Sequence, residues 1–129
     1  MEYIQGSIIA SIVILIMALI GYKFTPNTRS SFGYKTPMSL KNDSTWNFAN
    51  NLAKRLFLFV SLFFIVLQII LYNLLENDYY AFNYSFLFLT IASVIIVPII
   101  EIILNLKFDK DGFLKKKIKS DKKGNEIEN

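Results

Sequence analysis

The sequence has 129 residues, of which 53% are hydrophobic, and its net charge is +4. That length allows one domain at most. The chain contains no cysteine and no histidine, which excludes disulfides and thiolate chemistry and removes the commonest metal ligand and the commonest general base. We therefore expect no metal and no cofactor.

The apolar residues fall in three long blocks, at about residues 4–22, 56–75 and 84–106. Each block has roughly 20 residues, which at a helical rise of about 1.5 Å per residue crosses a hydrocarbon core about 30 Å thick. Because a backbone in lipid must satisfy its own hydrogen bonds, each block is expected to be helical. The sequence thus predicts an all-α integral membrane domain over residues 1–108 with three transmembrane helices.

The first block has the position of a signal peptide, which requires a basic start and a small-residue cleavage site. The chain instead has Glu2 at its start, and Tyr22, Lys23 and Phe24 where cleavage would fall. We interpret this block as a retained helix.

Lysine and arginine alternate with the predicted helices. The segment between the first two helices and the tail after residue 106 are rich in them, whereas the N-terminus and the connection holding Glu76 and Asp78 have none. By the positive-inside rule, this pattern predicts an outside N-terminus, a cytoplasmic tail and a multi-pass protein of the cell membrane. Tyr79, Tyr80 and Tyr84 fit an outer aromatic belt.

The tail, residues 109–129, is charged and has few apolar residues after Ile118. We expect it to be disordered or to lie on the surface. It would fix the topology, or clamp anionic lipid headgroups through Lys115, Lys116 and Lys117. Acidic residues interleaved with the lysines weaken its positive field, so the expected partner is the lipid bilayer and not nucleic acid.

The predicted cytoplasmic loop, residues 23–55, is expected to be structured. Pro26 stops the first helix, Gly33 permits a backbone turn and Pro37 favours an extended residue before it. Three successive residues suit a helix N-cap, namely Asn42, Asp43 and Ser44. A helix from about residue 44 to residue 75 would be roughly 48 Å long, which exceeds the membrane core by several turns.

On this helical extension, Trp46, Asn50 and Lys54 share one face because they are four residues apart. Trp46 is the only tryptophan and has two interpretations. It is an interfacial anchor, or it packs with Asn50 against a folded-back loop over residues 33–37 and shapes a site there.

The residues of this region resemble the signature of the SdpI family of bacterial membrane proteins. That signature has a Pro-Asn pair, a G-x-R-T-P-x-S loop and a W-x-x-A-N helix start. The matching residues here are Pro26-Asn27, Gly33 to Pro37, Ser39, Lys41-Asn42, Thr45-Trp46 and Ala49-Asn50. One departure is Lys35, where the family usually has arginine. Lysine cannot make a planar bidentate contact, so it would clamp a carboxylate or phosphate more weakly.

The resemblance implies immunity to a membrane-active peptide toxin, or toxin sensing by holding a regulator at the membrane. The candidate partners are therefore a peptide toxin and a membrane-recruited regulator. Further copies of the chain are a separate candidate, since three helices are few for a transport path. The candidate binding residues are Asn27, Gly33, Lys35, Thr36, Pro37, Ser39, Asn42, Trp46, Asn50 and Glu101.

Glu101 lies in the third apolar block, roughly 7–8 Å inside its cytoplasmic end at about 1.5 Å per residue. Acids within a membrane are costly and are usually paired or functional. We expect Glu101 to pair with a base of the facing loop, to snorkel, or to handle a proton or ligand. The candidate bases are Lys35, Lys54 and Arg55.

Two other classes of function remain open. A small oligomeric transporter or lipid-binding protein could use Glu101 together with Gln68, although Gln68 is more simply an interhelical hydrogen bond. An enzyme is not expected, because the sequence shows no nucleophile–base spacing, no phosphate loop and no paired carboxylates.

Overall fold

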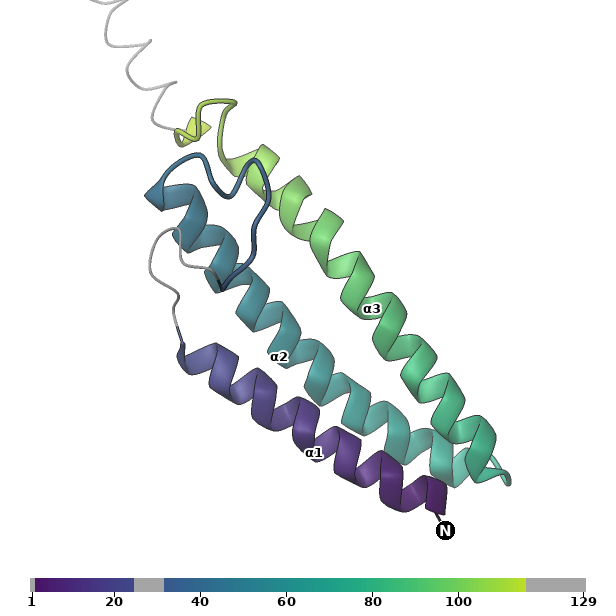
Figure 1. The fold of residues 1–129 in the computed structure, drawn as a ribbon. Helices are drawn as coiled ribbons and strands as arrows, with labels where there is room; N and C mark the ends of the chain where they lie inside the picture. The colour runs from purple at the N-terminus through teal and green to yellow at the C-terminus, as the bar shows by residue number, and fades with distance from the viewer. Residues whose placement is uncertain (1, 25–31, 116–129) are drawn as a thin grey trace, which may run out of the picture.

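The computed structural model describes residues 2–24 and 32–115, and these residues form three helices (Figure 1). Helix α1 spans Glu2–Lys23, α2 spans Asp43–Leu74 and α3 spans Asp78–Lys107. Each is long and apolar enough to cross a membrane, which confirms the predicted all-helical class and the three spans. Helix α3 begins ahead of its predicted span, because the Asn77 side chain caps it by accepting from the Tyr79 N–H at 2.9 Å.

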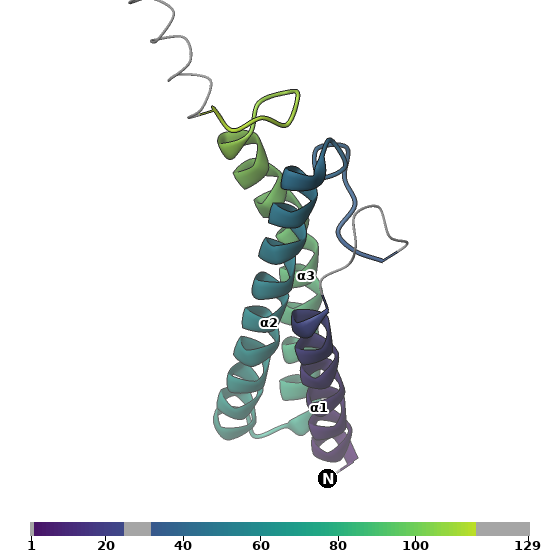
Figure 2. The same ribbon diagram turned by 90° about the vertical axis from the view of Figure 1, so that its left-hand side faces the viewer.

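The helices run side by side, and the three-residue connection 75–77 makes α2 and α3 antiparallel neighbours (Figures 1 and 2). Helix α2 has 32 residues and α3 has 30, against 22 for α1. At about 1.5 Å per residue, α2 is about 48 Å long and α1 about 33 Å. Helices α2 and α3 therefore extend beyond the end of α1 (Figure 2). Residues 32–42 pack against this extension of the two helices.

Helix α1 is held to α2 by a buried group of polar side chains. The Ser11 hydroxyl donates to the Gln68 carbonyl oxygen, and the Gln68 amide donates to the Ser7 hydroxyl. All three side chains are buried. The prediction that Gln68 makes an interhelical hydrogen bond is confirmed. Gln68 forms the buried polar part of this contact, and nearer the helix ends the Tyr72 hydroxyl of α2 donates to the Tyr3 carbonyl of α1 at 3.3 Å.

Replacing Gln68 with leucine is expected to weaken the attachment of α1 to α2 by about 1 kcal/mol, since both of its interhelical hydrogen bonds are lost. Denaturant unfolding in a single detergent would measure the change. Gln5→Leu is the matched control, because Gln5 is exposed on α1. An equal change in both variants would contradict a role for the buried hydrogen bonds.

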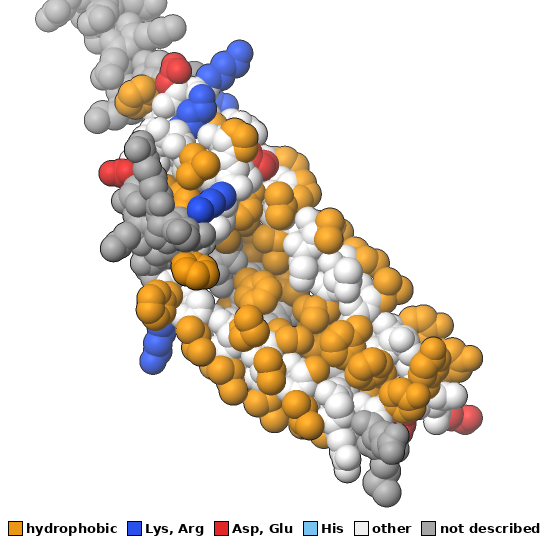
Figure 3. All heavy atoms as spheres, viewed as in Figure 1, with side chains coloured by type: hydrophobic (Ala, Val, Ile, Leu, Met, Phe, Trp, Pro, Cys, Tyr) orange, Lys and Arg blue, Asp and Glu red, His pale blue; other side chains and the backbone are white. Residues whose placement is uncertain are grey.

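The surface of the bundle divides into apolar sides and a basic end. Large hydrophobic side chains are exposed along all three helices. On the face shown in Figure 3, lysine and arginine gather towards the end that carries the loop. This distribution is that expected for a multi-pass membrane protein, in which apolar side chains face lipid and charges flank the hydrocarbon core.

Residues 108–115, hereafter the C-terminal turn, fold back after α3. The Asp109 N–H donates to the Phe113 carbonyl at 2.8 Å, and the Asp109 carboxylate accepts from the N–H groups of Asp111 and Phe113. Gly112 has a φ of +86°, which suits glycine. The expected disorder from residue 109 onwards therefore does not extend to residues 109–115, because Asp109 organises this turn through its own backbone neighbours. Residues 116–129 of the tail lie outside the described residues.

Candidate functional site

Residues 32–42, hereafter the motif loop, contain a single helical turn with its own capping box. The Thr36 N–H donates to Ser39 Oγ at 2.8 Å, and the Ser39 N–H donates to Thr36 Oγ1 at 3.2 Å. Pro37 follows the cap at the first helical position, where its missing N–H costs nothing. The Leu40 N–H closes the turn on the Thr36 carbonyl at 3.1 Å. The sequence T-P-M-S is thus a complete helix start.

A second capping box follows at once and begins α2. The Thr45 N–H donates to Asn42 Oδ1 at 3.0 Å, and the Asn42 N–H donates to Thr45 Oγ1 at 3.1 Å. Thr45 Oγ1 also lies 3.2 Å from the Ser39 carbonyl oxygen, which belongs to the first box. The two boxes therefore share a contact, and the loop enters α2 in one defined direction.

Gly33, Trp46 and Asn50 bring the start of the motif loop against α2. The Tyr34 N–H donates to Asn50 Oδ1 at 2.7 Å, and the Asn50 amide donates to the Trp46 carbonyl at 3.0 Å. Gly33 has a φ of +132°, and a Cβ there would lie 2.7 Å from Asn50 Oδ1 and 3.0 Å from Trp46 Cζ2. Only glycine fits this position.

Trp46 is buried, with 1% of its surface exposed. The packing of Trp46 and Asn50 against a folded-back loop is therefore present as predicted. The other interpretation of Trp46, an anchor in the membrane interface, does not fit this burial, because the indole lies inside the protein with its ring against Gly33.

The motif loop occupies a face of α2 that α1 covers further along. Residues 46, 50, 54 and 68 lie on one stripe, because steps of four and seven residues return to nearly the same side of a helix. On this stripe Gln68 contacts α1, the Lys54 ammonium lies 5.6 Å from the Tyr22 ring centroid, and Asn50 and Trp46 contact the loop. The loop thus takes the place of α1 where α1 ends.

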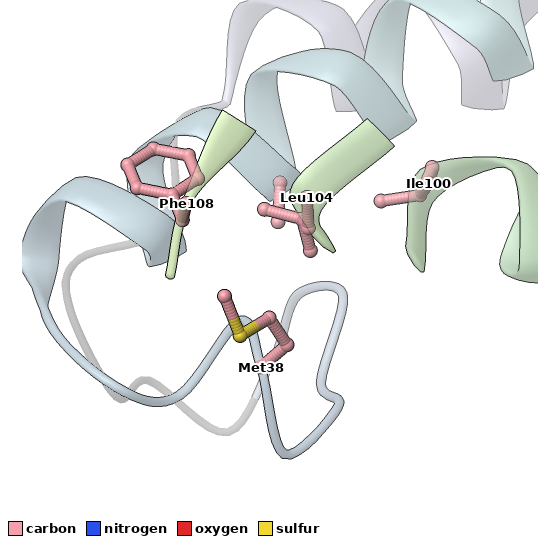
Figure 4. Packing of buried hydrophobic residues seen from close by; sticks show 5 residues of the cluster. Met38, Ile100, Leu104 and Phe108 are labelled. Carbon is pink, nitrogen blue, oxygen red and sulfur yellow. The ribbon is translucent and has the colours of Figure 1, made fainter. Parts of the chain in front are cut away.

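A small apolar core fixes the far side of the loop between α2 and α3. Met38 projects from the loop towards Leu104 and Phe108, with Ile100 beside them (Figure 4). The rings of Phe48 and Phe108 meet edge to face with centroids 5.7 Å apart. The motif loop is therefore attached to both helices, by hydrogen bonds on one side and by apolar contacts on the other.

Glu101 is half-buried on α3 and meets the loop through Tyr34. The Tyr34 hydroxyl donates to the Val97 carbonyl at 3.0 Å and lies 3.4 Å from Glu101 Oε1. Burial raises the pKa of Tyr34, and the negative charge of Glu101 raises it further. The phenol is therefore neutral at physiological pH and acts as a donor. The contact between Glu101 and the motif loop described here is therefore this one with Tyr34.

The predicted site residues divide into a scaffold and an exposed surface. Those that hold the loop in place are Gly33, Thr36, Ser39, Asn42, Trp46 and Asn50. Lys35 and Pro37 are exposed on its surface. Asn27 lies outside the described residues. Within residues 2–24 and 32–115, no group of His, Cys, Asp and Glu could hold a metal ion.

Three scaffold residues were not among the predicted site residues. They are Tyr34, Met38 and Thr45. The Asn42-x-x-Thr45 spacing is a capping pattern, and it offered a signal for Thr45. Nothing in the sequence places Tyr34 or Met38 against α3, because that contact depends on how the two long helices pack.

These features define a small multi-pass helical membrane protein with an ordered loop docked at one end of its bundle. A scan against family models matches the SdpI/YfhL protein family over residues 23–104. The match covers more than half of the chain, and the chain belongs to this family. It includes the motif loop, α2 and most of α3, whereas α1 up to Tyr22 and the C-terminal turn lie outside it. Searches of curated proteins and of solved structures found no match.

Proposed function

We propose that this protein protects a cell against a membrane-active peptide toxin, or senses such a toxin, through the exposed surface of the motif loop. The observation that supports this most is the docked loop itself, which lies within the segment matched by the family. Its polar side chains hold the backbone in place, so the loop is formed before any partner arrives. A preformed surface loses little conformational freedom on binding.

Lys35 is the residue of the loop best suited to contact the partner. It is exposed, and it lies between Tyr34 and Thr36, whose contacts fix the backbone on both sides. A carboxylate or phosphate of the partner would form a charge-assisted hydrogen bond with its ammonium group. The partner would be the toxin or a regulator recruited to the membrane.

We place the motif loop on the cytoplasmic side of the cell membrane, with the N-terminus outside. The exposed lysines of the described residues lie at the loop end, whereas the connection between α2 and α3 holds Glu76 and Asp78. The positive-inside rule supports this orientation.

Sensitive cells that express Lys35→Ala are expected to lose roughly tenfold in protection, since one charge-assisted hydrogen bond is removed. Survival and membrane potential would be measured under challenge with a panel of membrane-active peptide toxins. Lys35→Arg should protect at least as well as the wild type, because arginine adds a bidentate contact.

The control is Lys110→Ala, an exposed lysine outside the segment matched by the family. Membrane abundance would be matched between the variants. Their orientation would be checked by labelling a cysteine introduced as Glu76→Cys in intact cells, since the native chain has no cysteine that could react. Equal loss in the Lys35 and Lys110 variants would argue against the loop surface. Failure of abundant, correctly oriented wild type to protect against any toxin would overturn the immunity proposal.

The transport alternative requires Gln68 and Glu101 to face a common path. Gln68 instead bonds to Ser7 and Ser11 of α1, and Glu101 faces Tyr34 of the loop. These contacts within one protomer weigh against transport. We further propose that the protein is not an enzyme and acts by recognition.

A further inference from the structure

Glu101 has fewer hydrogen-bond donors around it than its carboxylate can accept. A carboxylate accepts about four hydrogen bonds. Among residues 2–24 and 32–115, the donor at Glu101 is the Tyr34 hydroxyl, whose oxygen lies 3.4 Å from Glu101 Oε1. That hydroxyl has a single hydrogen, and the Val97 carbonyl oxygen is the nearer acceptor at 3.0 Å. The described residues therefore leave most of the accepting capacity of this carboxylate unused.

A second acceptor lies on the same face of α3. Pro98 has no N–H, so the Val94 carbonyl lacks the donor that normally closes its helical turn. Val94, Pro98 and Glu101 share one face, because steps of four and three residues return to nearly the same side of a helix. In lipid an acceptor without a donor is costly, so this face of α3 requires donors from outside the helix.

The same face is open at the surface of the bundle. Val94 is 67% exposed, Pro98 is exposed and Glu101 is half-buried. Glu101 lies six residues before the end of α3, which is a depth of about 9 Å. The exposed neighbours are apolar, namely Val94, Val97 and Ile102. A ligand that reaches these acceptors must therefore carry its donor groups on an apolar body.

We propose that this face of α3, hereafter the acceptor face (residues 94–102), binds a basic side chain on an apolar segment of a membrane-inserted peptide. An ammonium group supplies three donors and a positive charge, which are what the Val94 carbonyl and the Glu101 carboxylate lack. The inference deepens the proposed function and rests on it for the source of the peptide, the toxin. Lys35 of the motif loop is then left for an acidic partner.

Photo-crosslinking of the full chain in phosphatidylcholine nanodiscs tests this assignment, since the choline headgroup has no N–H that could compete. The probe is an apolar helical peptide about 20 residues long, which crosses the bilayer, with one lysine near an end and a diazirine beside it. Crosslinks should fall on α3 between Val94 and Ile102. The same peptide with methionine in place of lysine should crosslink roughly tenfold less at limiting peptide, the effect of losing one charge-assisted hydrogen bond. Equal yields from the two peptides would overturn the proposal.

Two substitutions remove the two acceptors separately. Glu101→Gln should lower the yield of the lysine peptide roughly tenfold, and Pro98→Ala, which restores an N–H to the Val94 carbonyl, roughly fivefold. The matched control is Glu76→Gln, which removes an exposed acid between α2 and α3 and should leave the yield unchanged. An unchanged yield in Glu101→Gln, or an equal loss in Glu76→Gln, would overturn the site. An unchanged yield in Pro98→Ala would remove the Val94 carbonyl from it.

Tyr34→Phe separates the carboxylate from its contact with the motif loop. This substitution removes the hydroxyl and keeps the charge of Glu101, so the lysine peptide should crosslink at least as well as it does to the wild type. A loss as large as that in Glu101→Gln would assign the effect to the loop and overturn the acceptor face. Failed crosslinking with Lys35-dependent protection intact would overturn this inference alone, whereas crosslinking without any protection would overturn the immunity proposal alone.

Discussion

Replacing Gly33 with alanine is expected to release the motif loop from α2. The new Cβ would lie 2.7 Å from Asn50 Oδ1, and the φ of +132° is strained for any residue with a side chain. Strain of this kind together with loss of the hydrogen bond from Tyr34 to Asn50 costs about 3 kcal/mol, which corresponds to a roughly hundredfold increase in loop opening. Hydrogen exchange at the Tyr34, Leu40 and Lys41 amides would measure it.

Gly21→Ala is the matched control for this substitution. Gly21 lies within α1, and a Cβ there meets nothing within 4 Å. Alanine is favoured over glycine in a helix by about 1 kcal/mol, so no loss of stability is expected. Exchange in Gly33→Ala that matched the wild type would show that the loop does not depend on this close approach. Because the scaffold presents Lys35, Gly33→Ala should also lose the protection described above.

Leu104→Ala is expected to have a comparable effect on the whole loop end of the bundle. Leu104 is fully buried and lies beside Met38 and Phe108 in the core that joins the loop to α2 and α3. Truncating a buried leucine costs about 2–5 kcal/mol, through lost apolar contact and the cavity that remains. Unfolding in detergent would show the loss of stability, and exchange in the loop would show where it arises.

Leu106→Ala removes the same atoms from a different environment. Leu106 is 72% exposed on the outer side of α3, where lipid or detergent replaces the lost contacts. Its effect is expected to be small. Equal destabilisation by the two substitutions would mean that the core around Leu104 does not hold the loop end together.

The spans and the start of α2 could be predicted from the sequence because both depend on local patterns. Long apolar blocks are sufficient to identify membrane helices, and Asn42 occupies a recognisable capping position. The fold-back of the loop onto Trp46 and Asn50 could also be anticipated. Trp46 and Asn50 lie four residues apart, on one face of the predicted helix. The segment before them contains Gly33 and several polar residues, whose polar groups need hydrogen-bond partners if they are buried.

The remaining features depend on contacts that composition does not reveal. Charge counting offered Glu101 a basic partner, snorkelling or a direct role, and none of these pointed to the Tyr34 hydroxyl, which reaches α3 because the loop packs against both long helices. Charge density likewise predicted a tail that is disordered or lies on the surface from residue 109, and it gave no sign of an ordered turn there. A single carboxylate at Asp109 accepts two backbone N–H groups and organises the turn despite that composition.

The burial of Trp46 gives this protein an intrinsic optical reporter of the motif loop. The indole is the only one in the chain, and its six-membered ring lies against the Gly33 backbone. Its emission wavelength and its access to soluble quenchers should therefore follow the docking of the loop without any added dye. Titration of a candidate toxin or regulator into the unlabelled protein would then separate ligands that leave the loop seated from ligands that lift it away.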